Sequence, residues 1–411
     1  MNLIRSFRSV LRFKTFEWNA TKRRLGSVAS INELRLIAKK RLPAGIFDYI
    51  DGGAEDELTL RRNTADFSRI TFRPKVLADV ASIEVGGEIF DRPMTMPLIL
   101  SPTGFTRIAD PEGELAVARS AHRAGIPYTL STMATRSIEE VGAVSPPGAR
   151  NWFQVYVWRD RDLVESLLER ARIQQYEAIV ITVDTPVLGR RERDIRRGFL
   201  LPPKVGIDTL LEGARHPLWT FDLLRAEPIT FANLSGSNVG DGSSPVALAD
   251  QVNSQFDPSL SWRDIAWFRS RWAGPIVLKG IQRVEDAKIA VDSGVDAIAL
   301  SNHGGRQLDG SPSPVSLISE VVAEVNGAIP VLCDGGIRRG SDIAKALALG
   351  AKACMIGRAY LYGLASGGEQ GVDLSIALLR EGLVKTMALT GTRSVNEFSC
   401  DLVVTPSSWK S

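Results

Sequence analysis

The chain of 411 residues has an ordinary globular composition, with 44% hydrophobic and 24% charged side chains, which excludes disorder as its main state. Fifty basic residues against 47 acidic ones leave a net charge of +3, too small to indicate a nucleic-acid partner. No apolar run approaches the roughly 20 residues that a membrane-spanning helix needs. Three cysteines without a Cys-x-x-Cys pair provide neither a disulfide framework nor a multi-cysteine metal site. We therefore expect a protein of the reducing cytoplasm without a bound metal.

The N-terminus is basic, since its first 25 residues hold seven lysines or arginines and a single acid, Glu17. Organellar transit peptides share this composition with basic segments that pack on their own domain, so mitochondrial targeting stays open for the extension at residues 1–30. The pattern then predicts a short amphipathic helix over 32–41, capped by Asn32, and a second helix after a glycine turn. We expect these helices to precede the main domain.

From Pro97 onward, short apolar runs alternate with helical patterns. Strands that are apolar throughout are typical of parallel sheets with both faces buried. Eight strand–helix units therefore predict a (β/α)8 TIM barrel over residues 31–400, followed by a short tail at 401–411. The expected strands are residues 98–101, 128–132, 152–157, 178–184, 276–280, 297–302, 330–336 and 353–358.

A long insertion follows the fourth strand, at about residues 198–260. Its first part, GFLLPPKVGIDTLLEGARHPLWTFDLLRAEPITFANL, is apolar, aromatic and interrupted by prolines, and the Gly/Ser-rich SGSNVGDGSS follows it. Such a segment is either a lid over the barrel mouth or a surface that touches a membrane or a partner. The sequence leaves both alternatives open.

Glycines and arginines follow the last two predicted strands. In barrels of this type the active site lies at the carboxyl ends of the strands, and the loops after strands seven and eight commonly hold a phosphate. Gly335, Gly336 and Gly357 would let backbone N–H groups approach an anion, and Arg338 and Arg358 supply guanidinium donors. A phosphorylated ligand is therefore expected.

His303, one of three histidines, is the candidate catalytic base. It lies beside two glycines and Arg306, unlike a core histidine, and Asp184 ends a strand across the barrel. Imidazole accepts a proton near neutral pH and a carboxylate orients it, while Arg306 can bind a substrate carboxylate through two parallel hydrogen bonds. Lys279 ends a buried strand, where its charge is costly unless a negative group meets it.

Five motifs occur in an order and spacing that match one known family. They are SNHGGRQLD at 301–309, TVDTPVLGRRERD at 182–194, VLKG at 277–280, DGGIRRGSDIAKALALGA at 334–351 and IGRAYLYGLA at 356–365. The chain thereby resembles the FMN-dependent L-2-hydroxy-acid oxidases and dehydrogenases, the family of glycolate oxidase, L-lactate dehydrogenase and mandelate dehydrogenase. The resemblance covers roughly residues 30–400. It implies FMN as cofactor, a 2-hydroxy acid as substrate and a homotetramer.

The resemblance also implies a role for each matching position. His303 would be the base and Asp184 its carboxylate partner. Tyr156 would bind the reacting hydroxyl oxygen, and the substrate carboxylate would be bound by Tyr49, Arg191 and Arg306. The positions that match FMN contacts are Thr103, Gly104, Ser131, Gln154, Thr182, Lys279 and Ser301 around the flavin, and Asp334, Gly336, Arg338, Gly357 and Arg358 toward the ribityl phosphate.

Two positions depart from the glycolate oxidase pattern, because Gly104 stands in place of an alanine and Met133 in place of a tryptophan. A small residue at 104 is similar to the lactate and mandelate dehydrogenases, in which it accompanies poor oxygen reactivity. A flexible methionine leaves room for a substrate side chain larger than hydrogen. RHPLWTFDLLR at 215–225 resembles the segment of membrane-associated members that pass electrons to quinones. We expect oxidation of L-lactate or a larger analogue such as mandelate, with a quinone or another acceptor, on the inner membrane face.

Three alternatives stay open. The first is an oxidase that uses oxygen and releases hydrogen peroxide. The second is an FMN-binding barrel of another reaction type, such as an isomerase, which has no need for His303 together with Arg306. The third is a non-catalytic flavin-binding module whose basic N-terminus recruits a membrane or a partner. The presence of His303, Asp184, Lys279 and Arg306 argues against this last alternative.

Overall fold

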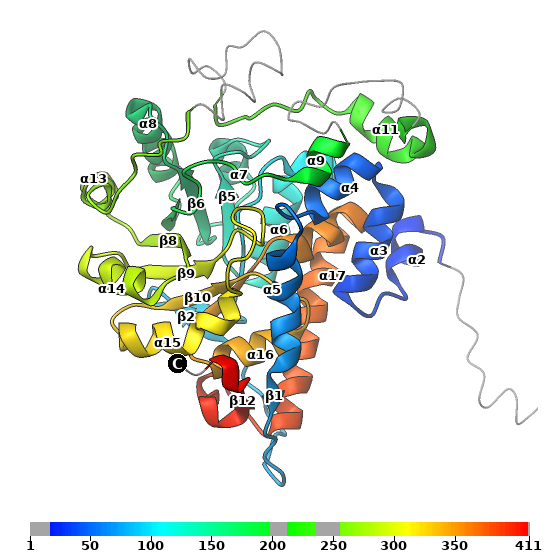
Figure 1. Cartoon of the computed structure of the whole chain (residues 1–411). Coiled ribbons are helices and arrows are strands. Elements are labelled where there is room, and N and C mark those ends of the chain that lie inside the picture. Colours follow the sequence, from blue (N-terminus) through cyan, green and yellow to red (C-terminus); the bar gives the residue numbers. More distant parts are fainter. Residues whose placement is uncertain (1–16, 198–211, 235–254, 410–411) are drawn as a thin grey trace, which may run out of the picture.

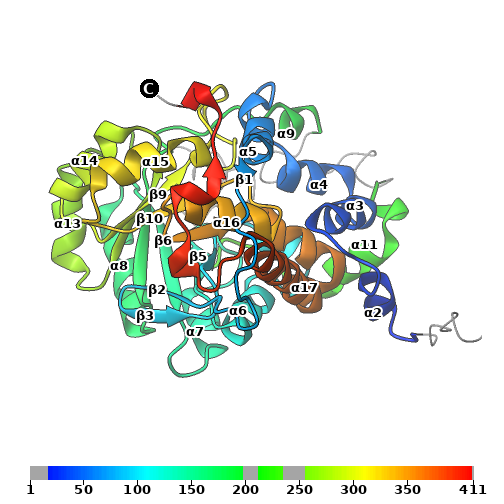
Figure 2. The same ribbon diagram turned by 90° about the horizontal axis from the view of Figure 1, so that it is seen from below.

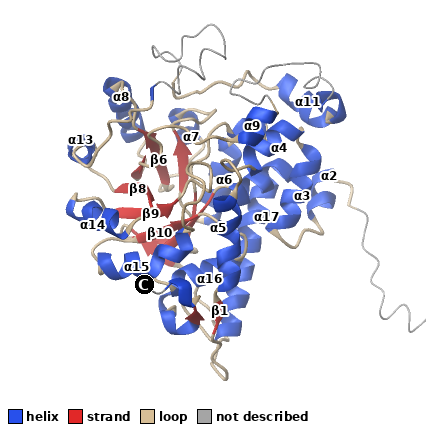
Figure 3. Ribbon diagram, viewed as in Figure 1, coloured by secondary structure: helices blue, strands red, loops and turns tan. Residues whose placement is uncertain are grey.

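The computed structural model describes residues 17–197, 212–234 and 255–409. Within these ranges, eight parallel strands close into a barrel in the order β10-β11-β4-β5-β6-β7-β8-β9, with helices around them (Figures 1 and 3). The predicted TIM barrel is therefore confirmed. Its strands are β4 (Leu98–Leu100), β5 (Tyr128–Ser131), β6 (Asn151–Tyr156), β7 (Ala178–Thr182), β8 (Ile276–Ile281), β9 (Ala297–Ser301), β10 (Val331–Asp334) and β11 (Ala353–Ile356).

Each barrel strand is buried along almost its whole length, which explains the continuous apolar runs of the sequence. The outer helices cover the strands, and inward side chains such as Trp152, Val180 and Leu332 fill the interior. The helices that follow the strands are α6 (Glu114–Ala124), α7 (Ile138–Ala143), α8 (Arg161–Ile173), α13 (Asp264–Arg271), α14 (Val284–Asp292), α15 (Pro314–Val325), α16 (Gly340–Ala348) and α17 (Arg358–Thr390).

A hairpin closes the end of the barrel opposite to the site. It consists of β2 (Gly87–Ile89) and β3 (Arg92–Met94), whose Ile89 and Met94 join the interior cluster. Arg150 holds the hairpin by donating to the carbonyl oxygens of Ile89, Arg92 and Pro93, and it forms a buried ion pair with Glu177 at 2.7 Å. A separate two-stranded sheet joins β1 (Thr71–Phe72) to β12 (Val403–Val404) of the predicted tail, and seen from below it lies apart from the hairpin end (Figure 2). This end is therefore a stability element rather than a site.

The N-terminal helices α2 (Ala20–Leu25), α3 (Ile31–Arg41), α4 (Ala44–Asp51) and α5 (Leu58–Arg69) precede the barrel, as expected. One cap prediction is wrong: α3 begins at Ile31, and its cap is Ser30 rather than Asn32. The Ser30 hydroxyl accepts a hydrogen bond from the Glu33 N–H, and Glu33 in turn accepts from the Ala29 N–H. This reciprocal pairing and the buried Ile31 side chain move the helix start one residue back from the predicted first residue.

Part of the basic extension is docked on the barrel. Helix α17 is kinked at Gly367 and Gly368, and Leu25 of α2 packs so tightly there that a Cβ on Gly367 would lie 2.7 Å from its Cδ1. Arg24 and Arg41 donate to the carbonyl oxygens of Ser366 and Ala365, which directly precede the kink. Residues 20–25 are thus a packed helix, while residues 1–16 of the extension, to which the targeting interpretation also applied, lie outside the described residues.

The described parts of the insertion lie at the carboxyl end of the barrel, where Figure 1 places α11 (Pro217–Arg225) at the periphery. Helix α9 (Glu192–Arg196), which precedes the insertion, lies beside α4. The Trp219 indole N–H donates to the Ile108 carbonyl oxygen at 2.8 Å and anchors α11. Residues 198–211 and 235–254 of the predicted insertion lie outside the described ranges. Among the residues that the structure describes, no helix is long and apolar enough to cross a membrane.

Candidate active site

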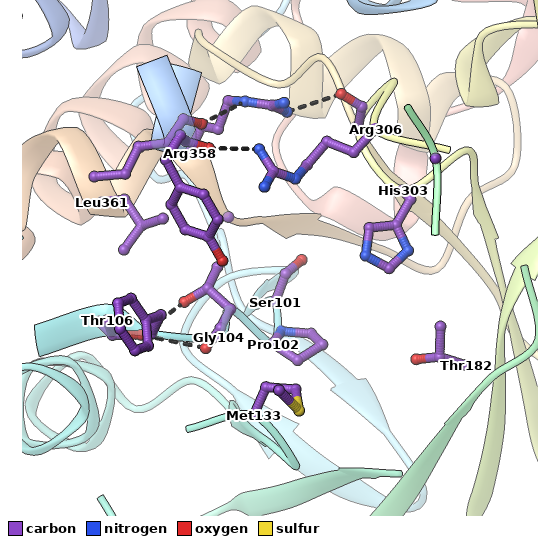
Figure 4. A pocket seen from close by; sticks show the side chains of 18 of the residues that line it. Ser101, Pro102, Gly104, Thr106, Met133, Thr182, His303, Arg306, Arg358 and Leu361 are labelled. Atoms are coloured by element: carbon purple, nitrogen blue, oxygen red, sulfur yellow. Dashed lines mark hydrogen bonds between the residues drawn. The ribbon is translucent and has the colours of Figure 1, made fainter. Parts of the chain in front are cut away.

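A cavity of about 520 Å³ opens at the carboxyl ends of the barrel strands. Four of the predicted site residues, Asp184, Ser131, Gln154 and Ser301, are not in its wall but bond to residues that are. Figure 4 shows His303 and Arg306 entering the cavity on one side, with Met133 across from them. The predicted residues that line it are Tyr49, Thr103, Gly104, Tyr156, Thr182, Arg191, Lys279, His303, Arg306, Asp334, Gly336, Arg338, Gly357 and Arg358.

His303 is held in an orientation suited to a base. Its Nδ1 lies 3.0 Å from Oδ1 of Asp184, which follows β7, and its Nε2 lies 3.4 Å from the Tyr156 hydroxyl. Burial lowers the pKa of His303 below its ordinary value, although Asp184 opposes the shift. The imidazole is therefore neutral at neutral pH, and with Nδ1–H donated to Asp184 its Nε2 can accept a proton.

Tyr156 is placed to donate a hydrogen bond. Its ring lies parallel to the His303 ring, with centroids 6.5 Å apart, and packs edge-on against Phe256. Burial and the nearby Asp184 raise the pKa of Tyr156, so the hydroxyl keeps its proton. A substrate oxygen between Tyr156 and His303 would thus have a donor on one side and a proton acceptor on the other.

Arg306 and Arg191 supply positive charge to the same region. Arg306 donates through Nη1 to the carbonyl oxygens of Tyr49 (2.6 Å) and Gly52 (3.2 Å), and its guanidinium lies 5.0 Å above the Tyr49 ring. Burial and the neighbouring Arg191 lower the pKa of Arg306 to about 9. Among the residues that the structure describes, the buried Nε of Arg191 has no hydrogen-bond partner, and its Nη1 lies 3.8 Å from Asp194. Asp194 is thus held only loosely by this pair of arginines, and a substrate carboxylate could bind both guanidinium groups.

Lys279 has a negatively charged partner, which a buried lysine requires. Its Nζ lies 2.8 Å from Oδ2 of Asp334 and 3.0 Å from the Ser301 hydroxyl, and Ser101 donates to the other Asp334 oxygen. Burial disfavours both charges, yet their attraction prevails, so the pKa of Lys279 is raised and that of Asp334 is lowered. The structure therefore places a stable ammonium group in the cavity wall.

The far end of the cavity provides an anion cradle. Gly336 has a φ of 82°, and a Cβ there would lie 1.9 Å from the Asn63 carbonyl oxygen, so only glycine suits this turn. Gly357 caps the N-terminus of α17, whose free N–H groups attract negative charge. Arg338 lines this end, with its guanidinium 5.8 Å from the Tyr362 ring. This donor set suits the phosphate of FMN.

Arg358 has a second task besides the predicted phosphate contact. Its guanidinium donates to the carbonyl oxygens of Ile50 (2.9 Å), Gly52 (2.6 Å) and Gly304 (2.9 Å), so α4 and the His303 loop are both fastened to the start of α17. Figure 4 shows this side chain turned toward those backbone atoms. Two of the five N–H donors of the guanidinium remain for a ligand.

Small and polar residues form the wall between these ends. Gly104 lies so close to Met133 that a Cβ at position 104 would be 3.0 Å from the Met133 Cβ. Behind the wall, Ser131 donates to Gln154 at 2.8 Å, and Gln154 donates to Thr182 at 3.0 Å. A flat apolar face with polar groups along one edge is what a flavin ring requires, so these positions are compatible with the predicted cofactor.

Sequence reasoning missed the aromatic residues that the insertion adds. Phe231 and Phe256 come from its described ends, are each 6% exposed and line the cavity. Phe231 packs on Phe105, with ring centroids 5.5 Å apart. The described parts of the insertion thus contribute two aromatic rings to the cavity wall, while α11 exposes Leu218 and Leu224. The only sequence signal was the aromatic content of the insertion, which does not say which ring turns inward.

The chain is similar to known proteins over almost all of its length. The family model described as FMN-dependent dehydrogenase matches residues 38–405. The chain is 45% identical over 396 residues to a putative L-lactate dehydrogenase of Mycobacterium tuberculosis, covering 96% of this chain and 94% of that one. It is 42% identical over 374 residues to the glycolate oxidase of Spinacia oleracea, with coverages of 90% and 94%.

Solved structures are also similar to the chain over almost all of its length. The crystal structure of the monotopic membrane protein (S)-mandelate dehydrogenase superposes with a TM-score of 0.88 at 38% identity, covering 92% of this chain and 100% of that chain. A mandelate oxidase superposes with a TM-score of 0.79 at 38% identity, with coverages of 92% and 99%. Both oxidases and dehydrogenases therefore share this fold and much of this sequence.

Proposed function

Because the chain belongs to the FMN-dependent dehydrogenase family, which oxidises 2-hydroxy acids, we propose that it oxidises an L-2-hydroxy acid with an apolar side chain and passes the electrons to a quinone. The observation that carries this proposal is one loop that presents both a proton acceptor, His303, and a cation, Arg306, to the same cavity. A base and a carboxylate clamp three positions apart on one loop suit a substrate whose hydroxyl and carboxylate share one carbon.

The chain's own residues have distinct tasks in this reaction. Arg306 and Arg191 would bind the carboxylate and thereby fix the Cα atom. Tyr156 would donate to the hydroxyl oxygen, and Nε2 of His303 would take a proton from the substrate, either from Cα or from the hydroxyl group. Asp184 would stabilise the imidazolium that results. In the overall reaction, the hydroxy acid loses two electrons and two protons and becomes a 2-oxo acid.

FMN, when bound, supplies the ring that accepts the electron pair. Gly336, Arg338 and the N-terminus of α17 would hold its phosphate. Lys279 would lie at the edge of the ring where negative charge develops, and Thr182 and the wall at Gly104 would flank it. The protein therefore contributes orientation and electrostatics.

The substrate side chain is proposed to be apolar and larger than hydrogen. Met133, Phe105, Phe231 and Phe256 line the cavity, which leaves an apolar wall for that group. Anaerobic mixing with glycolate, both lactate enantiomers, (S)-mandelate and longer aliphatic hydroxy acids tests this proposal through loss of flavin absorbance. We expect kcat/KM to rise with apolar side-chain size among the L-acids. A preference for glycolate would contradict it, and reduction by no acid would favour a non-catalytic module.

A second measurement identifies the electron acceptor. We propose a quinone because Gly104 resembles the dehydrogenases of the family, although oxygen is the alternative that the oxidase relatives suggest. The reduced enzyme is mixed first with air-saturated buffer and then with a soluble quinone. Rapid reoxidation by air with release of hydrogen peroxide would establish the oxidase alternative.

We also propose that α11 binds the membrane surface. Leu218, Phe221 and Leu224 lie three residues apart and are 68%, 54% and 79% exposed, and Arg225 lies over the Phe221 ring. Serine at all three positions is expected to abolish flotation of the protein with anionic vesicles while leaving flavin reduction intact.

The matched control for α11 is Leu389→Ser, which removes an equally exposed leucine from the far end of α17. It should leave flotation unchanged. Unaltered flotation of the triple variant would remove the membrane proposal. The homotetramer that the family implies is likewise a proposal, which light scattering of the purified protein tests.

A further inference from the structure

The loop that carries His303 rests on a helix outside the barrel, α5. The Asp309 carboxylate accepts hydrogen bonds from the backbone N–H groups of Leu58 (3.1 Å) and Thr59 (2.7 Å), at the first turn of α5. Farther along, Arg62 donates to the carbonyl oxygens of Gly310 and Ser311. The loop and the helix are therefore joined along two turns of α5.

The centre of this junction is a reciprocal pair of amides. Asn63 Nδ2 donates to Asn302 Oδ1 at 2.8 Å, and Asn302 Nδ2 donates to Asn63 Oδ1 at 2.7 Å. Asn302 also donates to the Pro312 carbonyl oxygen and accepts from the Gly305 N–H. The side chains of Asn63 and Asn302 are 2% and 1% exposed. All four hydrogen bonds that the Asn302 amide can make are thus satisfied without water.

The amide pair braces a strained turn. His303, Gly304 and Gly305 follow Asn302 with φ angles of 56°, 65° and 74°. The left-handed region is unfavourable for a histidine and persists only where the surroundings enforce it. The Asn302 side chain spans this turn by accepting from the Gly305 N–H, and Asn63 holds the Asn302 side chain in place.

The same residue of α5 also supports the turn that we expect to bind phosphate. The Asn63 carbonyl oxygen lies where a Cβ of Gly336 would be, and Asn63 Nδ2 would lie 3.5 Å from a Cβ of Gly335. One residue outside the barrel therefore contacts the base loop through its side chain and the glycine turn through its backbone carbonyl group.

We propose that Asn63 is a positioning residue that holds Asn302 and thereby fixes the left-handed turn presenting the His303 imidazole to Asp184 and the cavity. The inference rests on the proposed function, because it assigns to His303 the role of the base. It gives the N-terminal helices a part in catalysis besides covering the barrel.

Asn63→Leu tests this role, since leucine has a similar volume but cannot pair with Asn302. We expect the rate of flavin reduction at saturating substrate to fall by up to about 10²-fold, the size reported for small displacements of catalytic groups. Because Arg306 stays bonded to the carbonyl oxygens of Tyr49 and Gly52, substrate affinity should change much less than the rate.

A second readout does not depend on activity. The ring resonances of His303 are titrated by NMR in the protein without FMN, which is practical because the chain has three histidines and His303→Gln assigns the signal. Burial lowers the pKa of His303, so a loosened turn that admits water should raise that pKa toward its ordinary value. The charged or titratable groups that face His303 are Asp184, Tyr156, Lys279 and Arg191, and the substitution alters none of them.

Arg62→Met is the matched control, because it removes two hydrogen bonds between the same helix and the same loop, beyond the strained turn. It should lower stability without moving the His303 titration. Asn63→Ser, which leaves room for a water, provides a milder variant if the leucine variant does not fold, and should shift rate and titration in the same direction.

A folded Asn63 variant with wild-type titration and rate would overturn the inference. If the wild-type flavin is not reduced by any 2-hydroxy acid, the proposed function fails instead, and the NMR titration still decides whether Asn63 positions the histidine.

Discussion

Replacing His303 by glutamine is expected to slow reduction of bound FMN by a 2-hydroxy acid by about 10²- to 10⁴-fold, the usual contribution of a general base. Glutamine is close to histidine in size and can still donate to Asp184, so the cavity should keep its shape and its yellow cofactor. What it lacks is the proton acceptor at Nε2. Anaerobic stopped-flow absorbance with saturating substrate measures the effect, and unimpaired reduction would overturn the assignment of the base.

The pH dependence of the wild-type enzyme gives an independent check on this histidine. The reacting form is neutral, so the reduction rate should be lost as pH falls through the pKa of His303. Burial lowers that pKa despite the opposing Asp184, which places the acid limb below the ordinary range for histidine. The His303→Gln variant should show no such limb. An acid limb within the ordinary range would mean that the imidazole is more solvated than the geometry indicates, and a limb above that range would mean that Asp184 stabilises the imidazolium more strongly than burial opposes it.

The sequence alone was sufficient to predict the barrel, because parallel strands buried on both faces are read as uninterrupted apolar runs. The barrel topology then brings the ends of these strands together. His303 and Asp184 are 119 positions apart in the sequence, yet they follow strands of the same barrel, and their side chains lie 3.0 Å apart. Helix starts were less certain. Ser30 and Asn32 are both good caps, and the choice depends on how Ile31 and Glu33 pack.

The parts that could not be predicted depend on packing between distant segments. Asn63 belongs to a helix whose polar pattern is ordinary, and only its contact with Asn302, 239 positions away, gives it a role. Phe231 turns into the cavity whereas Phe221 of the same insertion is 54% exposed, although both occur in apolar surroundings in the sequence. Arg358 was expected to face a phosphate, and its bonds to three carbonyl oxygens required the fold of α4 to be known.

Replacing Arg306 by methionine is expected to weaken substrate binding and turnover together while FMN stays bound. Methionine keeps much of the apolar stem but removes the cation, and the loss of one member of a buried charge pair costs about 2–5 kcal/mol, or roughly 30- to 5,000-fold in kcat/KM. Because Arg191 lines the same cavity and keeps its positive charge, we expect some activity to remain.

The conservative variant Arg306→Lys separates charge from geometry in this prediction. Lysine keeps a positive charge but cannot form two parallel hydrogen bonds to a carboxylate while it bonds to the carbonyl oxygens of Tyr49 and Gly52. Its kcat/KM should therefore lie between those of the wild type and Arg306→Met. Steady-state kinetics with L-lactate and with (S)-mandelate measure both variants. If methionine at 306 changed kcat/KM for neither acid, the carboxylate would have to bind elsewhere, and the buried cation with its pKa lowered to about 9 would need another anion.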